Sequence, residues 1–425
     1  MPNAAPEAAE RRLRNLRVGG LSLIGFFMMM GYSMARPAVE SLFLAAHGHE
    51  ALPYGYLSVV VVMGISVVVY NRFVGRVSLP KLYAAASLIA AALLAALQGA
   101  IALELPGAHL LLYAWKDVYM VVQVEIFYSY CATVFAIGTA RWVYGFFGVI
   151  GSLGGLVGNL GVGPLARTLG SAGSLWLLVP MLLAGAAAAL WLGQHAAEAQ
   201  VPAAALRPRI SEAWRVVRQS RWLLLIMALV ALTQTAITLI DFSFNQAVQE
   251  AVPNTDERTA VIGQIYAAVS VGTFVLNALT GPILRLAGVP ATLLSIPFLL
   301  ASAVVSFLVM PAFAVAAALK IASKCFDYTV FRSAKEILYI PLSLPEKTAG
   351  KSIVDMLTYR TAKGAASVLL LGLSAVGLST WALGATLVVI SLWLGVTIVL
   401  VRRFRLTVSR EEEMRGQTRG QNSKR

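Results

Sequence analysis

Residues 80–103 read PKLYAAASLIAAALLAALQGAIAL, and Lys81 is the one charged side chain among them. An α-helix rises about 1.5 Å per residue, and the hydrocarbon core of a bilayer is about 30 Å thick. A helix of this length therefore crosses a membrane. In water it would expose far too much apolar surface, so this stretch decides the class of the protein.

The composition of the whole chain agrees with this segment. Of the 425 residues, 58% are hydrophobic and 13% are charged, and the mean hydropathy is +0.75. A soluble domain carries about 25% charged residues. These figures exclude a soluble, disordered, collagen-like or disulfide-stapled protein. The two cysteines, Cys131 and Cys325, lie far apart in apolar runs and are expected to be small buried side chains.

The sequence contains eleven further apolar runs long enough to span a bilayer. Together with residues 80–103 they predict an all-α membrane protein with twelve transmembrane helices. The other runs are 18–45, 54–71, 108–136, 142–168, 174–194, 221–247, 258–285, 290–309, 312–340, 349–377 and 379–401.

A polar stretch at 195–220 divides the runs into two sets of six, and the sets resemble one another at an offset near 210 residues. Arg76 and Pro80 after the second run correspond to Arg285 and Pro290 after the eighth. Two parallel six-helix repeats are typical of the major-facilitator architecture. The predicted segments are a basic leader (1–17), an N-terminal half (18–194), a central loop (195–220), a C-terminal half (221–401) and a basic tail (402–425).

The distribution of basic residues predicts the orientation. With a cytoplasmic N-terminus, 24 Lys and Arg residues fall on the cytoplasmic side and three, Arg36, Arg167 and Arg258, on the other. This bias predicts that both termini are cytoplasmic, in the inner membrane. It also accounts for most of the net charge of +14 without nucleic acid as a partner. The first helix is expected to be retained, and the tail to be attracted to anionic lipid.

The fifth run is rich in glycine. Gly151 and Gly155, and likewise Gly154 and Gly158, form small-xxx-small patterns that allow close approach of helix backbones. We interpret this face as a packing surface. A phosphate-binding loop is the alternative, and it conflicts with the position of the glycines inside an apolar helix.

Seven basic residues fall inside the predicted spans, where each costs roughly 2.5–3.5 kcal/mol if it faces lipid. They must face a polar cavity, pair with acids or lie near a boundary. Internal salt bridges with Asp117, Glu125, Asp241 and Asp355 are one interpretation. A cationic cavity for an anionic solute is the other, because the cations outnumber these acids. The seven are Lys116, Lys320, Lys324, Arg332, Lys335, Arg360 and Lys363.

Helical spacing groups several of these charges. At 100° per residue, Lys320, Lys324, Asp327, Phe331 and Lys335 lie on one stripe of the tenth run. In the eleventh run, Arg360 and Lys363 lie three residues apart and about 60° from each other.

No constellation for enzymatic catalysis, a metal or a cofactor stands out in the sequence. His47 and His49 lie in a short loop and are expected to be solvated rather than metal ligands. Gly350-Lys351-Ser352 imitates the end of a phosphate-binding loop, but Pro345 occupies the position where that motif requires glycine. The sequence therefore predicts neither an enzyme nor a cofactor protein.

Several motifs resemble the nucleotide transporter (ATP/ADP translocase) family of plastids and intracellular bacteria. The strongest is Ala334-Lys-Glu-Ile-Leu-Tyr-Ile-Pro-Leu342, followed by Gly350-Lys351, Asp355, Arg360 and Lys363-Gly364. Others are Gly31-Tyr32-x-x-x-Arg36 with Glu40, then Glu125, then Ala140-Arg141-Trp142 with the glycines that follow. The sequence departs from the family pattern at Val39 and Asn245, where the family has lysine, and at Phe127, where it has tryptophan.

The resemblance implies a secondary transporter that moves a nucleotide or related organic anion by alternating access. Two alternatives stay open: a proton-coupled transporter of another solute, and a membrane sensor or scaffold that has lost transport. The oligomeric state is not predicted. The residues that the resemblance and the charge pattern select for the substrate site are Arg36, Glu125, Asp241, Lys324, Lys335, Arg360 and Lys363.

Overall fold

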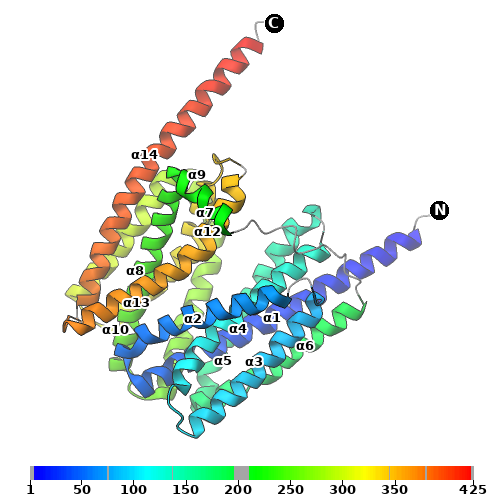
Figure 1. The fold of residues 1–425 in the computed structure, drawn as a ribbon, viewed down its shortest axis with the longest axis vertical. Helices are drawn as coiled ribbons and strands as arrows, with labels where there is room; N and C mark the ends of the chain where they lie inside the picture. The colour runs from blue at the N-terminus through cyan, green and yellow to red at the C-terminus, as the bar shows by residue number, and fades with distance from the viewer. Residues whose placement is uncertain are drawn as a thin grey trace. The chain divides into compact units, whose positions relative to one another are not determined.

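The computed structural model describes residues 4–73, 76–135, 137–195, 210–343, 345–378 and 381–422. Nearly all of these residues are helical (Figure 1). Most of the predicted central loop and the last residues of the predicted tail lie outside the described ranges. The chain divides into two compact units. The first comprises residues 1–206 with 248–271, and the second comprises residues 207–247 with 272–425.

Six long helices form most of the first unit. Short turns join them, among them a 3-10 turn at His49–Ala51. The six helices are α1 (Ala4–His47), α2 (Leu52–Phe73), α3 (Leu79–Ala102), α4 (Ala108–Val134), α5 (Ile137–Leu175) and α6 (Leu178–His195).

The second unit begins with a short helix and continues with segments of very different length. Its helices α8, α9 and α14 are long, although the parts of α8 and α9 within residues 248–271 belong to the first unit. Turns of π-helix interrupt α10 to α13. The helices are α7 (Ile210–Gln219), α8 (Arg221–Ala251), α9 (Thr255–Val309), α10 (Phe313–Phe326), α11 (Arg332–Ile337), α12 (Lys351–Ile353), α13 (Tyr359–Ala375) and α14 (Ala382–Asn422). The π turns are η3 (Asp327–Phe331), η4 (Glu346–Gly350) and η5 (Val354–Thr358).

Within the described part of the chain, eight helices are long and apolar enough to cross a membrane. α9 contains two of the predicted runs, joined through Gly288. α4 is not among the eight, and the interrupted segments between Phe313 and Ala375 are too short. The all-helical membrane class is therefore confirmed, and the number twelve stays a prediction.

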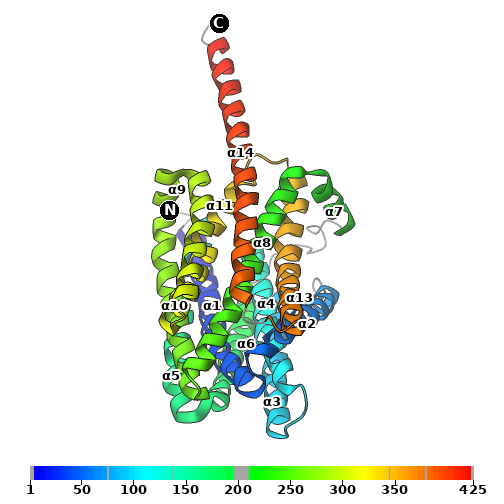
Figure 2. The same cartoon turned by 90° about the vertical axis from the view of Figure 1, so that its left-hand side faces the viewer.

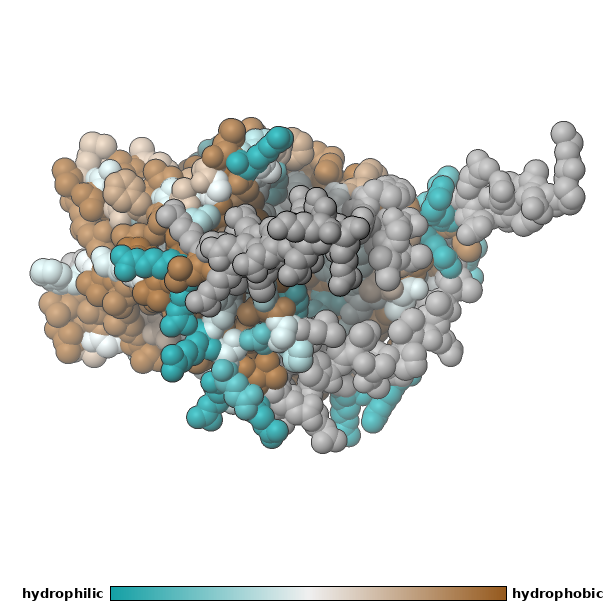
Figure 3. Space-filling view, turned by 90° about the horizontal axis from the view of Figure 1, so that it is seen from above, coloured by the Kyte–Doolittle hydropathy of each residue, from teal (hydrophilic) through white to brown (hydrophobic). Residues whose placement is uncertain are grey.

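The surface of both units is that of a membrane protein. Large apolar side chains are exposed on many helices, for example Val68 (71%), Ile89 (60%) and Phe298 (65%). In Figure 3, hydrophobic residues cover much of the visible described surface, with hydrophilic patches between them. Lipid is the solvent that such a surface requires, because water would make this exposure costly.

The glycine face of α5 packs against α1, as the sequence predicts. A methyl group added at Gly154 would collide with the backbone carbonyl of Phe26, and one added at Gly158 would collide with that of Met30. Any larger residue at these two positions would push the helices apart. The fifth-run glycines are therefore a packing surface.

Two glycines with positive φ occupy corresponding places in the two halves. Gly170 has φ 75° where α5 kinks near its end, and Gly377 has φ 71° just after α13. They lie 207 residues apart, close to the offset of about 210 residues read from the sequence. Glycine adopts this left-handed conformation without steric cost, which explains its presence at both places.

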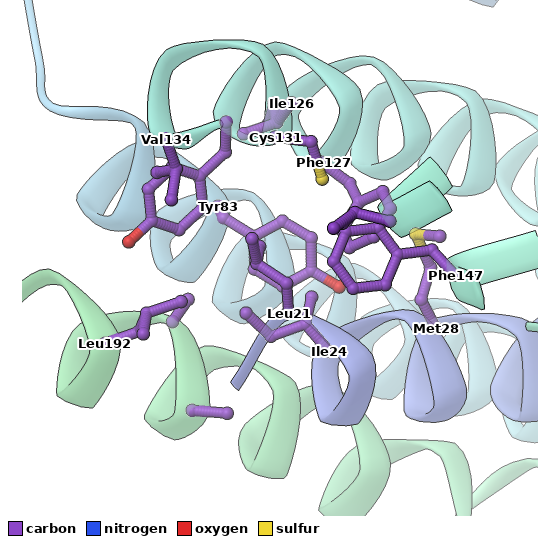
Figure 4. Packing of buried hydrophobic residues seen from close by; sticks show 14 residues of the cluster. Leu21, Ile24, Met28, Tyr83, Ile126, Phe127, Cys131, Val134, Phe147 and Leu192 are labelled. Atoms are coloured by element: carbon purple, nitrogen blue, oxygen red, sulfur yellow. The ribbon is translucent and has the colours of Figure 1, made fainter. Parts of the chain in front are cut away.

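The core of the first unit lies among α1, α3, α4, α5 and α6 (Figure 4). Leu21, Ile24, Tyr83 and Cys131 are nearly inaccessible there. Phe127 belongs to this core and meets the ring of Phe147 edge-on at 5.6 Å. The residue that replaces the family's tryptophan is thus a packing residue. Both cysteines are buried, as predicted.

α14 extends well beyond the predicted last span. Figures 1 and 2 show one continuous helix that includes residues 402–422 of the predicted tail. Likewise α1 begins at Ala4, so most of the predicted leader is the first part of a transmembrane helix. The charged ends of the chain therefore continue the helices that enter the membrane.

Candidate functional site

A charged and aromatic cluster surrounds Arg36 in the first unit. Its Nε donates to Oε1 of Glu40, one turn later on α1, over 3.3 Å. Its guanidinium lies 3.9 Å from the centre of the Tyr266 ring, and the Tyr266 hydroxyl donates to Oε2 of Glu40 over 3.5 Å. Tyr32 supplies a second ring at 5.9 Å. A planar cation between aromatic faces is held in a fixed orientation.

A second charged group lies on α4, and the sequence did not select it for the site. Lys116 is 2% exposed and its Nζ lies 3.9 Å from the centre of the Tyr113 ring. The same Nζ is 3.2 Å from Oδ1 of Asp117, which also accepts a hydrogen bond from Tyr32 over 3.4 Å. Tyr32 therefore lies beside both Arg36 and Asp117. Glu125, two turns further along α4, is exposed.

In the second unit, one carboxylate binds two lysines. Nζ of Lys320 lies 2.7 Å from Oδ1 of Asp241, and Nζ of Lys324 lies 2.8 Å from its Oδ2. The two lysine side chains are almost fully buried, and that of Asp241 is 19% exposed. Two lysines on one carboxylate leave a net positive charge, and this charge can bind an added anion.

Asp327 forms the next layer of this network. It is 7% exposed, and its two oxygens accept hydrogen bonds from Gln234 Nε2 (3.0 Å) and from the hydroxyl of Tyr359 (2.9 Å). Gln234 and Tyr359 were not selected from the sequence. The spacing of Gln234 and Asp241, seven residues apart on α8, is the signal that could have found Gln234, because such residues share a helix face.

All five residues of the predicted stripe on the tenth run are buried, but the segment is not one regular helix. The π turn η3 occupies residues 327–331, and a π-helix bonds residue i to i+5 rather than i+4. The periodicity of 100° per residue therefore fails across this turn. Lys320 and Lys324 bind Asp241 on α8, whereas Lys335 lies 2.6 Å from Oδ1 of Asp355 in η5.

A further ion pair joins the ends of these segments. Lys351 binds Glu336, and its Nζ lies 5.2 Å from the centre of the Tyr339 ring. Lys351 belongs to the motif that imitates a phosphate-binding loop. A methyl group on its neighbour Gly350 would collide with Leu223. The motif is therefore packed against α8 and presents no open loop of backbone amides for a phosphate.

Arg360 and Lys363 lie in the regular helix α13 and are half-buried. Lys363 is one turn after Tyr359, so the two residues share a face of α13. Since Tyr359 binds Asp327, this face is the one turned toward the buried network. The segment thus presents Lys363 on the side where Asp327 lies.

Several of the acids predicted as partners of the cations inside the spans lie beside a lysine. Asp241, Asp355 and Asp117 each lie within ion-pair distance of a predicted lysine. Internal salt bridges are therefore present at these three proposed acids.

Residues 248–271 are attached to the rest of the first unit by a set of polar contacts. Arg167 of α5 donates from Nε and Nη2 to the carboxylate of Glu257, over 2.9–3.2 Å. Asp256 accepts hydrogen bonds from the backbone and side chain of Ser171. Arg258, 2% exposed, donates to the carbonyl of Ser41 on α1 over 3.0 Å.

Backbone packing supports these contacts. A methyl group on Gly163 would touch Ala260, and one on Gly263 would collide with Val162 and the carbonyl of Asn159. The start of α9 therefore lies close against α5, where small residues permit it.

Residues 304–404 match the family model of the TLC ATP/ADP transporters. This segment contains Lys320, Lys324, Lys335, Arg360 and Lys363. ADP,ATP carrier protein 1 of Chlamydia trachomatis serovar D is 24% identical over 290 residues, which cover 58% of this chain and 55% of that protein. The carrier of the same name in Chlamydia muridarum matches equally. The match spans about half the length of these relatives.

Solved transporter structures share the fold. An auto-inhibited peptide transporter of the POT family has a TM-score of 0.65 at 14% identity, covering 94% of this chain and 97% of that one. A bacterial homologue of the lysosomal transporter Spinster has a TM-score of 0.64 at 13% identity, with 93% and 98% covered. The nucleoside transporter NupG has a TM-score of 0.62 at 11% identity, with 93% and 99% covered. The predicted major-facilitator-like fold is thereby confirmed.

Proposed function

We propose that this chain, a divergent relative of the ATP/ADP transporter family, is a secondary active transporter that moves a nucleotide or related organic anion by alternating access. The observation that carries the proposal is the pair of buried lysines on Asp241. A transported phosphate or carboxylate offers the same oxygen chemistry as the Asp241 side chain. The substrate anion can therefore bind one of the two lysines while the other lysine stays bound to Asp241.

The composition of the surrounding segment supports an anion rather than a cation. Between Phe313 and Ala375 the chain carries eight Lys and Arg residues and four Asp and Glu residues. Asp241 adds one acid and still leaves the cations in excess. A positive field of this kind attracts anions and repels cations.

Each proposed substrate-binding residue has a chemical role. Lys324, Lys335 and Lys363 supply ammonium groups, and Arg36 and Arg360 supply guanidinium groups that can bind two phosphate oxygens at once. Asp241 and Glu125 exchange partners as the site changes state. In this proposal the two six-helix halves, 18–194 and 221–401, are the bodies that move during transport.

The relatives support the nucleotide as first candidate. The matched Chlamydia proteins are named ADP,ATP carriers, and the family model over residues 304–404 is that of ATP/ADP transporters. The positions that depart from the family pattern, Val39 and Asn245, lack two cations. A substrate with fewer charges than ATP would fit a site that has lost two lysines.

Uptake into proteoliposomes tests the proposal. The purified protein is reconstituted and offered labelled ATP, ADP, AMP, a sugar phosphate and a dicarboxylate, each with and without the same solute inside. We expect saturable uptake of at least one anion, competed by the others according to their charge. Absence of flux for every anion would support the sensor or scaffold instead, and uptake of organic cations alone would contradict the anionic site.

A proton-coupled transporter is the second candidate, and Asp327 is the observation that favours it. Its two oxygens accept hydrogen bonds from Gln234 and Tyr359, which are neutral donors. A buried carboxylate can take up a proton in such surroundings, because neither of these two donors carries a charge that would lose its partner. Lys324 and Asp241 are the charged groups near Asp327 that would respond to a change in its protonation. Uptake driven by an imposed pH gradient, and lost in Asp327→Asn, would select this candidate.

The membrane and orientation complete the proposal. We place the protein in the cytoplasmic (inner) membrane with both termini in the cytoplasm, on the strength of the Lys and Arg distribution. No cofactor or nucleic acid is part of the proposed function.

A further inference from the structure

A groove runs along the surface of the first unit between α1 and α6, apart from the charged clusters. Its volume is about 1080 Å³. α1 contributes Arg12, Asn15, Leu16, Gly19, Gly20 and Leu23, which recur every three or four residues and therefore occupy one face of the helix. α6 contributes a second face of the same kind, between Ala184 and Trp191.

The chemistry of the groove changes along its length. Arg12 and Asn15 lie at one end, and Leu23 lies eleven residues further along α1, about 16 Å deeper at 1.5 Å per residue. Leu192 of α6 lies against Gly20, so the neighbouring Trp191 lies deeper along the groove than Arg12. The groove is thus polar at its Arg12 end and lined by apolar residues beyond it.

We propose that this groove binds one anionic phospholipid. The phosphate lies at Arg12 and Asn15, and one acyl chain lies over Gly19 and the alanines of α6. The depth of about 16 Å matches one leaflet, which is half of the hydrocarbon thickness of about 30 Å. Arginine near the end of a transmembrane helix lies at the level of the lipid headgroups.

Charge complementarity selects an anionic lipid over a neutral one. Arg12 is exposed and lines one end of the groove. A positive charge therefore lies beside the apolar part of the groove. A free inorganic phosphate would gain the charge contact but nothing from the apolar part, whereas a phospholipid gains both.

The glycines keep the groove open. A methyl group built on Gly19 would meet no atom within 4 Å, so the space over this residue is unfilled by the described chain. Gly20 in contrast is buried, and its face is closed by Leu192. Gly19→Leu would place a side chain in the acyl position without a collision, so the variant is expected to fold.

Native mass spectrometry of the full chain with phosphatidylglycerol or phosphatidylcholine of identical acyl chains tests the proposal. We expect retention of one phosphatidylglycerol in preference to phosphatidylcholine. Gly19→Leu should abolish that retention. Arg12→Ala should lower phosphatidylglycerol affinity about fivefold, the change for one basic residue near the headgroup, and leave phosphatidylcholine unchanged.

Two matched variants complete the experiment. Arg14→Ala removes an exposed arginine two positions away, on the opposite side of α1, and Gly99→Leu fills open space on α3. Both should retain lipid as the parent protein does. Equal retention in Gly19→Leu and the parent, or equal loss in Arg12→Ala and Arg14→Ala, would overturn the proposal. A Gly19→Leu variant that melts at a lower temperature but still binds lipid would also overturn the proposal. The leucine would then collide with the protein itself and would not occupy the position of the acyl chain.

Discussion

Lys320 and Lys324 lie one helical turn apart on α10 and bind different oxygens of the same carboxylate, that of Asp241. Each lysine is almost fully buried, so its ammonium group is stabilised by this acid. The arrangement is both a structural ion pair and a site where one partner can be exchanged. Removal of the acid distinguishes the two roles.

Asp241→Asn should leave two buried ammonium groups with an amide in place of their carboxylate. Removing one partner of a buried pair costs about 3–5 kcal/mol, so the melting temperature should fall by several degrees in the absence of anions. If an anion takes the place of the carboxylate, added pyrophosphate should restore most of the loss. Thermal unfolding with and without pyrophosphate measures this, and a loss that no anion restores would leave Asp241 with a structural role alone.

Lys363 offers a test of substrate binding with little effect on the fold. It is half-buried on α13, on the face that also carries Tyr359. Lys363→Ala should abolish anion binding in a titration while the melting temperature stays nearly unchanged. Lys363→Arg should restore charge without the same geometry and give partial transport at most. A variant that transports normally but melts many degrees lower would assign Lys363 to structure.

The orientation can be tested by labelling. Cysteines introduced near position 210 and in residues 410–425 should react with a membrane-impermeant maleimide only after the cytoplasmic side is exposed. The reason is the bias of Lys and Arg toward the predicted cytoplasmic segments. Both native cysteines are buried and give a low background. Reaction at either introduced position in intact cells would reverse the topology.

The contact between Arg167 and Glu257 should matter for transport more than for stability. Both side chains are about half exposed, and pairs of this kind contribute about 0–1 kcal/mol. Since Glu257 lies in the first turn of α9 and binds Arg167 of α5, the release of this ion pair is expected to accompany a change of access. Arg167→Glu should slow exchange across proteoliposomes with little change in melting temperature, and the added Glu257→Arg should recover the rate. Equal exchange rates in the parent, in Arg167→Glu and in the double variant would show that this ion pair has no role in transport.

Glu346 makes stability depend on acid pH. Burial acts to raise its pKa, but hydrogen bonds from Ser220 and Ser343 outweigh burial, so the pKa is lower in the folded protein than its usual value of 4.5. A carboxyl whose pKa is lowered by folding stabilises the protein above its usual pKa, and the contribution is lost as the pH falls below about 4.5 and through the folded value.

Melting curves between pH 3 and pH 7 should therefore show a steeper acid loss in the parent than in Glu346→Gln. Lys347→Ala, at the neighbouring position, is the matched control and should follow the parent. Identical pH dependence in the parent and Glu346→Gln would show that Glu346 does not contribute to the loss of stability in acid.

The sequence predicted the class and the packing better than it predicted the site. Apolar length and glycine spacing depend on local geometry, and both the membrane helices and the contact of Gly154 and Gly158 with α1 followed from them. The ion-pair acids Asp117, Asp241 and Asp355 were also found, because buried cations need acids within reach. The assignment of the substrate residues stays a prediction.

The sequence did not predict the departures from regular helix geometry. The π turn at 327–331 lies between Lys324 and Lys335, and no residue type in that stretch indicates a π turn. Gln234 and Tyr359 were missed because a neutral amide and a phenol carry no charge that marks them in an apolar run. Their role depends on the position of Asp327, which only the folded chain supplies.

The close contact between α1 and α5 has a mechanical consequence. Backbone meets backbone at Gly154 and Gly158, so neither helix can slide along the other without steric collision. Arg36 on α1 and Arg167 on α5 therefore lie on two helices that are packed tightly against each other. A displacement of α1 is expected to carry α5 with it, and so to reach the ion pair between Arg167 and Glu257.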